Sequence, residues 1–504
     1  MRYTLLLVFI LTIHVLSAQK HDHIWMYGNE GNHPLTKVTK MIFTSDSFDI
    51  EQTDFEGTFD LTSAAISNTK GEFAFYSNGL HIYNKEGHIM DNGDTINGPA
   101  NSYWYAVEKT GYRARYFILP MSFDTSIYYL IHQKFYEDPP WIEMGTHEIM
   151  YSKVDISQND GLGRVIEKNV PVVKGNRLEQ FTAVRHGNGR DWWVVGTHNL
   201  EPLVSRFLIT PEGVGQPITQ VVPSIVIDST IAANNFCGFT PDGNKFIHYN
   251  FVHGIWIYDF DRCTGEVSNP LHIVLPPDNV GWTGFSFEVS ANSRYLYAVA
   301  KGFTRIMQYD LLADDVQASG DTIAYHDGYL YNGNIVTTFA FLQRAPNGKI
   351  YISSGYNTQL HVINNPDLPG AACGFVLRGI ELPTWNNQST PHIPNYRLYD
   401  APGSPCDSLG INAPVSVQEW PEWLRQPCVA YPNPAQEVCT IYLPNWQGEG
   451  TLRITDMNGT LTTEQRITRD RTTLWVRHWP AGTYIATVWK EGILFSSQKI
   501  VVQN

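Results

Sequence analysis

The sequence predicts an all-β protein: a β-propeller, with seven blades as the favoured count, followed by a small immunoglobulin-like β-sandwich. The 504-residue chain is 13% aromatic and contains 40 Gly and 29 Pro, a composition that suits many short strands and turns. Turn signals recur along the chain at a long and nearly regular period. The composition changes near residue 400, before a second series of short strands begins.

The stretch 239–277 shows the repeating unit most clearly. The turn Pro241-Asp242-Gly243 is followed by apolar segments at 246–251 and 255–258, a second turn, and a further strand at 271–275. A four-stranded meander of this length is one propeller blade. Corresponding turns lie at Gly71, Thr125, Gly189, Gly243, Ser293 and Gly348, so the spacings are 54, 64, 54, 50 and 55 residues. Such a period favours propeller blades over the alternative, a two-sheet sandwich, which has no long repeat.

Closure of the propeller is expected to involve both ends of the domain, residues 19–400. A circular propeller must pair or cover its sheet edges. The segments Trp25-Met26-Tyr27 and His392–Tyr399 both have the character of short strands. We expect them to share one blade, which with six internal copies makes seven; six and eight blades remain alternatives.

Residues 1–18 are predicted to be a secretory signal peptide. Arg2 precedes the apolar run Leu5–Ile13, and the small residues Ser17 and Ala18 come before Gln19, which is the pattern of a cleaved leader. The alternative is a transmembrane anchor, for which the apolar run is short. We therefore expect no transmembrane segment in the mature chain.

The charge balance argues against nucleic acid as a partner. The chain has 35 Lys and Arg against 49 Asp and Glu, a formal net charge of −14. An acidic chain without a run of Lys or Arg repels phosphate backbones.

Six cysteines in an exported chain allow disulfides. The favoured pairing, out of fifteen possible, is local and joins Cys237 to Cys263, Cys373 to Cys406, and Cys428 to Cys439. No CxxC or His-x-x-x-His pattern is present, so no zinc site is predicted.

A linker is predicted at residues 401–428, where Ala401-Pro402-Gly403-Ser404-Pro405 disfavours regular structure. The module 429–504 follows. Its expected strands are Val438–Leu443, Thr451–Asp456, Gly459–Ile467, Thr472–Val476, Gly482–Trp489 and Phe495–Val502. This many short strands in fewer than about 80 residues predicts a small sandwich.

Four motifs occur in order in this module: Tyr431-Pro432-Asn433-Pro434, Ile454-Thr455-Asp456 with Gly459, Pro480-Ala481-Gly482-Thr483-Tyr484, and Lys499-Ile500-Val501-Val502. With them the module resembles the type A C-terminal sorting domain of the type IX secretion system of Bacteroidota. The upstream domain resembles, less specifically, secreted propeller-like proteins of the same bacteria, through Trp25–Asn29, Phe75–Gly79 and Met90–Gly93. A carbohydrate-binding or adhesive sandwich is the alternative for the module, since fold alone does not set function.

The resemblance implies export across the outer membrane, with the module as the export signal. It implies two partners, the type IX machinery and a sortase-like protease, and a protein that is secreted or attached to the outer cell surface. The sorting-motif residues that it implies are Pro432, Asn433, Pro434, Gly459, Gly482, Tyr484, Lys499 and Val501.

No catalytic residue is predicted. The chain has no GxSxG elbow, HExxH motif or P-loop. The densest polar and aromatic cluster is residues 186–193, in which His186 and Asp191 are a conceivable acid and base. The favoured interpretation is a hairpin in which Trp192 and Trp193 fill opposite faces while His186 bonds locally.

Two further groups contain residue types that bind metal ions. His21-Asp22-His23 is a conceivable transition-metal site, although a mobile terminus is favoured. Asp259, Asp261 and Glu266 surround a turn, but their spacing departs from the EF-hand pattern. No metal and no cofactor are therefore predicted.

Aromatic residues at expected blade connections are the better indication of function. These are Tyr103-Trp104-Tyr105, Pro139-Pro140-Trp141 and Trp282. Rings at loop rims provide binding area at a small entropy cost. The sequence thus favours a binding module for an unknown extracellular glycan or protein. The alternative is an extracellular hydrolase or lyase acting on polysaccharide, with carboxylates in the central channel. An apolar or uncharged channel would favour binding.

Overall fold

The computed structural model describes residues 19–28, 37–44, 47–97, 116–134, 148–174, 178–198, 201–225, 235–250, 252–276, 286–300, 302–409, 428–444, 446, 448–456, 460–490 and 493–503. The chain divides into two compact units, residues 1–413 and 414–504. The predicted signal peptide lies outside the described residues. The described helical elements are the short α2 (Gln158–Gly161) and the 3-10 turn η1 (Gly370–Cys373), and no described helix is long and apolar enough to cross a membrane. The fold is therefore all-β.

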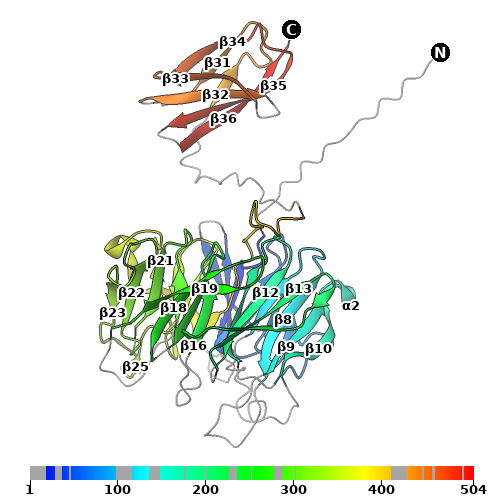
Figure 1. Cartoon of the computed structure of the whole chain (residues 1–504), viewed down its shortest axis with the longest axis vertical. Coiled ribbons are helices and arrows are strands. Elements are labelled where there is room, and N and C mark those ends of the chain that lie inside the picture. Colours follow the sequence, from blue (N-terminus) through cyan, green and yellow to red (C-terminus); the bar gives the residue numbers. More distant parts are fainter. Residues whose placement is uncertain are drawn as a thin grey trace, which may run out of the picture. The chain divides into compact units, whose positions relative to one another are not determined.

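The first unit consists of small sheets that follow one another along the chain (Figure 1). The first strands are β1 (Ile24–Gly28), β2 (Val38–Phe43) and β3 (Phe48–Thr53), then β4 (Asp60–Ser67), β5 (Phe73–Ser77) and β6 (Ile82–Asn84). The next two sheets contain β7 (Tyr116–Pro120), β8 (Ile127–Lys134), β9 (Glu148–Asp155) and β10 (Arg164–Val173), then β11 (Leu178–Arg185), β12 (Trp192–His198), β13 (Leu203–Thr210), β14 (Gly213–Val214) and β15 (Ile218–Val221).

Three further groups of strands complete the unit. They are β16 (Asn235–Phe239), β17 (Lys245–Asn250), β18 (Gly254–Phe260) and β19 (Val267–Ile273); β20 (Phe287–Val289), β21 (Tyr295–Val299), β22 (Arg305–Asp310) and β23 (Asp321–Tyr325); and β26 (Leu342–Arg344), β27 (Ile350–Ile352), β28 (Asn357–Ile363) and β29 (Phe375–Pro391). A two-stranded hairpin, β24 (Leu330–Tyr331) and β25 (Ile335–Val336), lies between the last two groups in the chain.

The turns that the sequence singled out each join the first two strands of a sheet. Gly243 connects β16 to β17 with a φ of 72°, and Ser293 connects β20 to β21 with a φ of 60°. This left-handed conformation costs glycine almost nothing, which explains why four of the six turn positions are Gly. The regular spacing of the turns therefore reflects a recurring local geometry.

Each sheet packs against the sheets before and after it in the chain. Strand alternation sends Trp192 into a core shared with β7 and β8, whereas Trp193 enters a core shared with β16–β19. Likewise Ile257 faces β20–β22, whereas Trp256 faces β12 and β13. Because the central strands have both faces covered, they are nearly continuous apolar runs. The unit is thus many small packed sheets, and the alternative of two large facing sheets is wrong.

The end of the unit returns to its beginning. The end of β29 pairs in parallel with β4, with Asn387 opposite Asp60 and Thr390 opposite Thr62. The sheet β1–β3 packs Trp25 and Tyr27 against residues of β27–β29, and Ile24 and Met26 against residues of β4–β6. The expectation of a strand at His392–Tyr399 is wrong, because this segment is irregular and bonds to several sheets.

The local cysteine pairing is wrong. Cys263 forms a disulfide with Cys406, across 143 residues. Cys237 lies in mid-strand on β16, two strands away from β18, whereas Cys263 lies in the turn after β18. Cys373 lies in η1, while Cys406 lies beside Gly187, where a Cβ would collide with its Sγ. The remaining four cysteines are buried and form no disulfide, so the predicted Cys428–Cys439 bond is also not formed.

The disulfide also shows that part of the predicted linker 401–428 belongs to the first unit. Its first residues are tied to the first unit, since Ala401 N donates to Gly187 O at 2.7 Å and Cys406 is bonded to Cys263. Residues 410–427 lie outside the described part of the chain.

The second unit is a two-sheet β-sandwich around one core. One sheet has the order β30-β31-β34, from β30 (Val429–Tyr431), β31 (Val438–Tyr442) and β34 (Arg471–Trp475). The other has the order β33-β32-β35-β36, from β32 (Gly450–Asp456), β33 (Leu461–Ile467), β35 (Gly482–Lys490) and β36 (Ile493–Val502). The expected strands of this module correspond to these within two residues, and both sheets contribute to the core.

Candidate functional site

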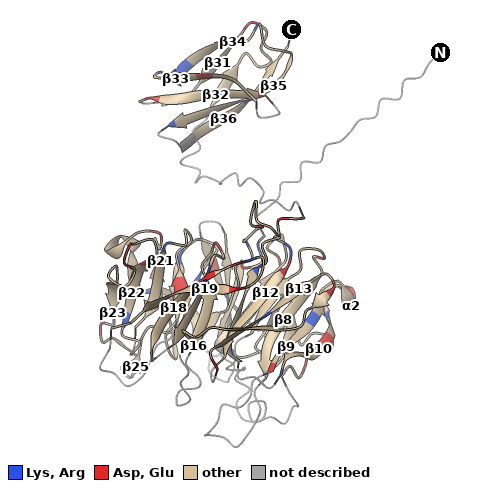
Figure 2. Ribbon diagram, in the orientation of Figure 1, with Lys and Arg blue, Asp and Glu red and all other residues tan. Residues whose placement is uncertain are grey.

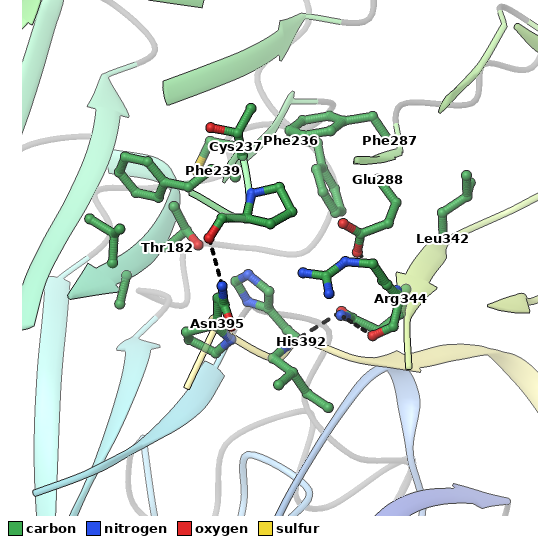
Figure 3. A pocket seen from close by; sticks show the side chains of 18 residues that line it. Thr182, Phe236, Cys237, Phe239, Phe287, Glu288, Leu342, Arg344, His392 and Asn395 are labelled. Carbon is green, nitrogen blue, oxygen red and sulfur yellow. Dashed lines mark hydrogen bonds between the residues drawn. The ribbon is translucent and has the colours of Figure 1, made fainter. Parts of the chain in front are cut away.

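A small cavity lies among the first strands of four successive sheets in the first unit, namely β11, β16, β20 and β26 (Figure 3). Its volume is about 70 Å³. Residues 392–395 line it as well. Small-molecule sites usually measure roughly 300–1,000 Å³, so this cavity has room for a few waters and not for a sugar ring.

Charge in the cavity comes from Glu288 and Arg344, with His392 nearby. Figure 3 shows the guanidinium of Arg344 pointing into the cavity, with the carboxylate of Glu288 on one side and the His392 imidazole on the other. Glu288 Oε1 accepts from Val289 N at 2.9 Å and Oε2 from Arg344 N at 3.0 Å. Burial raises the pKa of Glu288, and the positive charge of Arg344 and the two amides oppose this shift.

Among the described lining residues Glu288 is the one carboxylate. Glycoside hydrolysis usually requires two carboxyl groups about 5–10 Å apart, with one free to donate a proton. Here the single carboxylate is held by two backbone amides. Among the described lining residues, the one carboxylate therefore links β20 to β26 through backbone hydrogen bonds.

The irregular segment 392–400 closes one side of this cavity and ties distant sheets together. Asn395 Nδ2 donates to Pro241 O at 2.7 Å, and Tyr396 OH donates to Ile118 O at 2.7 Å. Arg397 forms an ion pair with Asp22 at 2.8 Å. These bonds join the end of the first unit to β7, to the β16–β17 turn and to its first residues.

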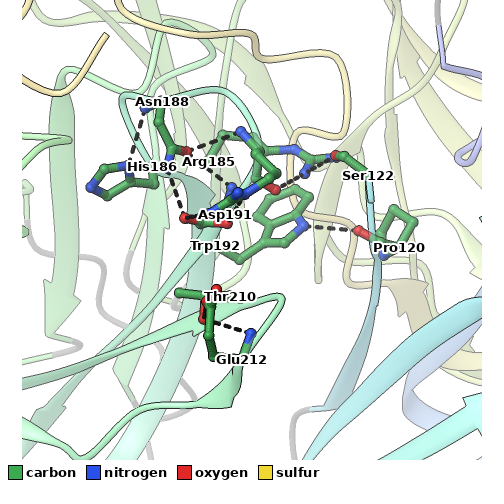
Figure 4. Close-up of polar contacts among 10 residues, drawn as sticks. Pro120, Ser122, Arg185, His186, Asn188, Asp191, Trp192, Thr210 and Glu212 are labelled. Atoms are coloured by element: carbon green, nitrogen blue, oxygen red, sulfur yellow. Dashed lines mark hydrogen bonds and ion pairs between the residues drawn. The ribbon is translucent and has the colours of Figure 1, made fainter. Parts of the chain in front are cut away.

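The cluster at residues 186–193 is a structural hairpin (Figure 4). His186 Nδ1 accepts from Asn188 N at 3.0 Å, and its Nε2 lies 3.1 Å from Cys263 O. Asp191 pairs with Arg190 and accepts from Asn188 Nδ2 at 2.7 Å. Both carboxylate oxygens and both ring nitrogens are thus engaged locally, as the favoured interpretation of this cluster requires.

Arg185 extends this network into the core. Its guanidinium lies 4.0 Å from the Trp192 ring centroid and donates to Ser122 Oγ at 2.7 Å and Arg190 O at 2.8 Å (Figure 4). Burial lowers the pKa of Arg185 to about 9, while the negative charge of Asp191 opposes this shift.

The other groups considered as metal ligands have structural contacts. His21 is buried, with Nδ1 2.6 Å from Ser67 O, and burial lowers its pKa to about 4. The expectation of a mobile terminus at residues 21–23 is wrong, because His21 and Asp22 pack against the unit.

The three carboxylates of the β18–β19 region are also engaged. Asp259 pairs with Lys245, Asp261 Oδ1 accepts from Cys263 N at 2.7 Å, and Glu266 lies 3.6 Å from Arg206. No group of three His, Cys, Asp or Glu side chains suited to a metal ion occurs among the described residues.

The aromatic residues predicted at blade connections, Tyr103-Trp104-Tyr105, Trp141 and Trp282, lie outside the described residues. A different exposed group was missed by the sequence reasoning. We call it the tyrosine surface, and its members are Tyr325, Tyr329, Leu330, Val336 and Tyr356. Tyr325 is 62% exposed and Tyr356 is 52% exposed.

The tyrosine surface is centred on the β24–β25 hairpin. Arg378 lies 4.4 Å from the ring centroid of Tyr329 and pairs with Asp327 at 2.6 Å. Tyr331 on β24 accepts from Thr358 Oγ1 at 3.3 Å, which places the hairpin against β28. The sequence Tyr329-Leu330-Tyr331-Asn332-Gly333 combines aromatic residues with an Asn-Gly turn. That pattern alone indicates a hairpin that carries aromatic side chains.

In the second unit the first and last of the predicted sorting motifs meet in space. Asn433 Nδ2 donates to Lys499 O at 2.7 Å, and its Oδ1 accepts from Val501 N at 2.8 Å. The first motif is thereby fastened to the last strand, where Gly482 of β35 also pairs with Val502. Tyr484 is buried and its OH donates to Pro480 O at 2.8 Å. Pro432 and Pro434 follow β30, and Gly459 lies outside the described residues.

Comparison with protein families identifies the second unit. Residues 429–503 match the family model described as the secretion system C-terminal sorting domain. The resemblance to a type IX sorting domain is thus confirmed, and the module directs export by that system to the cell surface or the medium. No curated protein matches the chain.

Among solved structures, the chain is similar to PorZ, an essential surface component of the type IX secretion system of Porphyromonas gingivalis. The identity is 12% and the TM-score 0.36, over 93% of this chain and 63% of the PorZ chain. It is also similar to a Lactobacillus plantarum protein, with 12% identity and a TM-score of 0.43 over 73% of this chain and 98% of that one. A third similar structure is a putative 6-phosphogluconolactonase from Bacteroides uniformis. The identity is 12% and the TM-score 0.37, over 90% of this chain and 99% of that one.

Proposed function

We propose that the first unit of this exported protein, residues 19–400, is a seven-bladed propeller that acts as a binding module for an extracellular protein. Among the described strands, the count of seven blades treats β1–β3 as one blade, divides the seven-stranded sheet β26-β27-β28-β29-β4-β5-β6 between β29 and β4, and leaves out the two-stranded hairpin β24–β25. The proposal of a propeller is supported by the cores, each of which joins neighbouring sheets in chain order. It is supported further by the contact of β1–β3 with both the last and the second sheet.

The tyrosine surface is the observation that carries the binding role. Single exposed apolar residues are ordinary, but Leu330 and Val336 lie opposite each other on one hairpin, next to Tyr329. Tyr325 ends β23, four residues before Tyr329, and Tyr356 comes two residues before Thr358, which bonds to Tyr331 of the hairpin. An exposed apolar group of this kind is typical of an interaction site. Tyr with Arg is the side-chain combination that supplies much of the energy at protein interfaces. Arg378, already stacked on Tyr329 and paired with Asp327, is positioned for such a contact.

A protein ligand fits this surface better than a glycan. Leu330 and Val336 stand among the tyrosines and are exposed, and neither can bond a sugar hydroxyl. Their burial against an apolar partner contributes about 25 cal/mol per Å² of area removed from water. The alternative, a polysaccharide hydrolase or lyase, finds little support in a cavity of about 70 Å³ with one held carboxylate.

The test compares the full chain with the double variant Tyr325→Ser, Tyr356→Ser. Labelled protein is incubated with extracellular proteins and with a panel of purified glycans, and the bound species is identified and titrated. Phe123→Ser is the matched control, since Phe123 is an exposed ring in the β7–β8 turn. Affinity for one protein should fall at least about 10-fold in the double variant and stay within about 2-fold in the control.

Two results would refute the binding proposal. One is equal affinity of the double variant and the parent chain, and the other is release of reducing sugar from polysaccharide by the parent chain. If the parent chain binds a glycan and the double variant does not, the tyrosine surface is the binding site but its ligand is a glycan and not a protein.

A further inference from the structure

The outer side of the sheet β30-β31-β34 in the sorting domain is unusually apolar for a surface. Along each strand alternate residues face the core, as Ala430, Cys439, Ile441 and Leu474 do. The residues between them face outward. We call this set the aromatic face: Val429, Tyr431, Val438, Thr440, Tyr442, Arg471, Thr473 and Trp475.

Strand register places these side chains in adjoining rows. Tyr431 lies opposite Thr440, which lies opposite Thr473. Tyr442 lies opposite both Val429 and Arg471. Side chains opposite one another on neighbouring strands have Cβ atoms about 5 Å apart, so the face is continuous.

Trp475 and Arg471 are its most distinctive members. Trp475 is 74% exposed and lies on the edge strand β34, opposite Val438. Arg471 places its guanidinium 5.0 Å from the ring centroid of Tyr442. The face thus carries a large exposed indole, two tyrosines and one cation, and none of its eight residues is acidic.

The outer side of the other sheet is different. There Arg453 pairs with Glu464 at 2.6 Å on β32 and β33, and Arg466 pairs with Glu449. Figure 2 shows coloured charged segments along β32 and β33 of this unit. The two outer sides therefore differ in charge. The β33-β32-β35-β36 side carries these ion pairs, and its Arg453 also lies 5.6 Å from the ring centroid of Trp489, whereas the aromatic face has one cation and no acidic residue.

We propose that the aromatic face is the surface through which the sorting domain docks onto a protein of the export machinery. The complementary patch on that partner is apolar and carries a carboxylate that meets Arg471. This inference rests on the sorting function of residues 429–503 and names the surface that performs it. Exposed Trp, Tyr and Arg together are the composition of interface hot spots, and a face with one cation and no carboxylate is complementary to an acidic apolar patch.

The test uses the full chain expressed in a bacterium that has a type IX secretion system. Trp475→Ser and Arg471→Glu are the test variants, and Leu461→Ser is the matched control. Leu461 is 53% exposed at the start of β33, in the other sheet. The readout is the ratio of protein at the surface and in the medium to protein in the periplasm, measured by quantitative immunoblot.

Each test variant should lower the exported ratio at least about 5-fold, because loss of one hot-spot residue weakens binding by 5-fold or more. Leu461→Ser should stay within about 2-fold of the parent chain. Thermal unfolding of the purified variants is measured alongside. Should Trp475→Ser unfold within its module, Arg471→Glu decides the outcome, because a charge reversal at an exposed site leaves the core intact.

Deletion of residues 429–504 separates this proposal from the sorting assignment. If the deletion stops export while both point variants are exported like the parent chain, the aromatic face is not the docking surface and the sorting assignment stands. If the deleted chain is exported normally, the sorting assignment and the docking proposal both fail. A concentration-dependent dimer that Trp475→Ser abolishes without changing export would assign the face to a second copy, and would overturn the proposal.

Discussion

Removal of the disulfide by Cys406→Ser should lower the melting temperature of the first unit substantially. The bond closes a loop across 143 residues, between the β18–β19 turn and the end of the unit. In the chain-entropy model, a loop of that length removes unfolded-state entropy equivalent to about 5 kcal/mol at 25 °C. A unit of about 400 residues unfolds with roughly 0.8 kcal/mol per kelvin of entropy, which corresponds to a fall of about 6 °C.

The assay is differential scanning calorimetry of the full chain with and without reductant. The parent chain should lose about 6 °C on reduction, whereas Cys406→Ser should melt at the same temperature under both conditions. Cys373→Ser is the control, because Cys373 is a buried free thiol and this variant should keep the reductant effect. The reasoning is refuted if Cys406→Ser responds to reductant as the parent does, or if peptide mapping links Cys263 to Cys237.

Two further predictions concern a buried histidine and a sorting motif. Burial lowers the pKa of His248 on β17 to about 4, from an ordinary value of 6.5. As the pH falls, the unfolded chain therefore takes up the proton before the folded one. The free energy of unfolding, which is unaffected above pH 6.5, should decrease by about 3 kcal/mol as the pH drops to 4. In the variant His248→Leu, the melting temperature should depend less on pH between 6.5 and 4. The same dependence in the variant and the parent chain would contradict the lowered pKa of His248. Asn433→Ala removes two hydrogen bonds to the Lys499–Val501 backbone and should destabilise the second unit by about 1–2 kcal/mol. Limited proteolysis should then cleave within residues 429–504 faster, while Thr462→Ala, an exposed change on β33, should cleave at the parent rate.

Sequence alone determined the elements whose causes are local. The turns at Gly71, Gly189, Gly243 and Gly348 were recognisable because a left-handed turn selects glycine. The strands of the sorting domain followed from apolar alternation and hairpin signals within about ten residues. The opposite-facing Trp192 and Trp193 followed from the two-residue period of a strand.

Tertiary structure alone decided the features that depend on where distant segments meet. Cys406 reaches Cys263 only because residues 392–405 run from the end of β29 to the β11–β12 and β18–β19 turns, and the spacing of cysteines in the sequence does not indicate that path. The parallel pairing of β29 with β4 joins Asn387 to Asp60, and no local pattern identifies a strand's partner. Exposure, too, is a property of the packed fold: Tyr325 and Trp475 lie in strands that resemble buried ones, yet nothing in the described chain covers their outer faces.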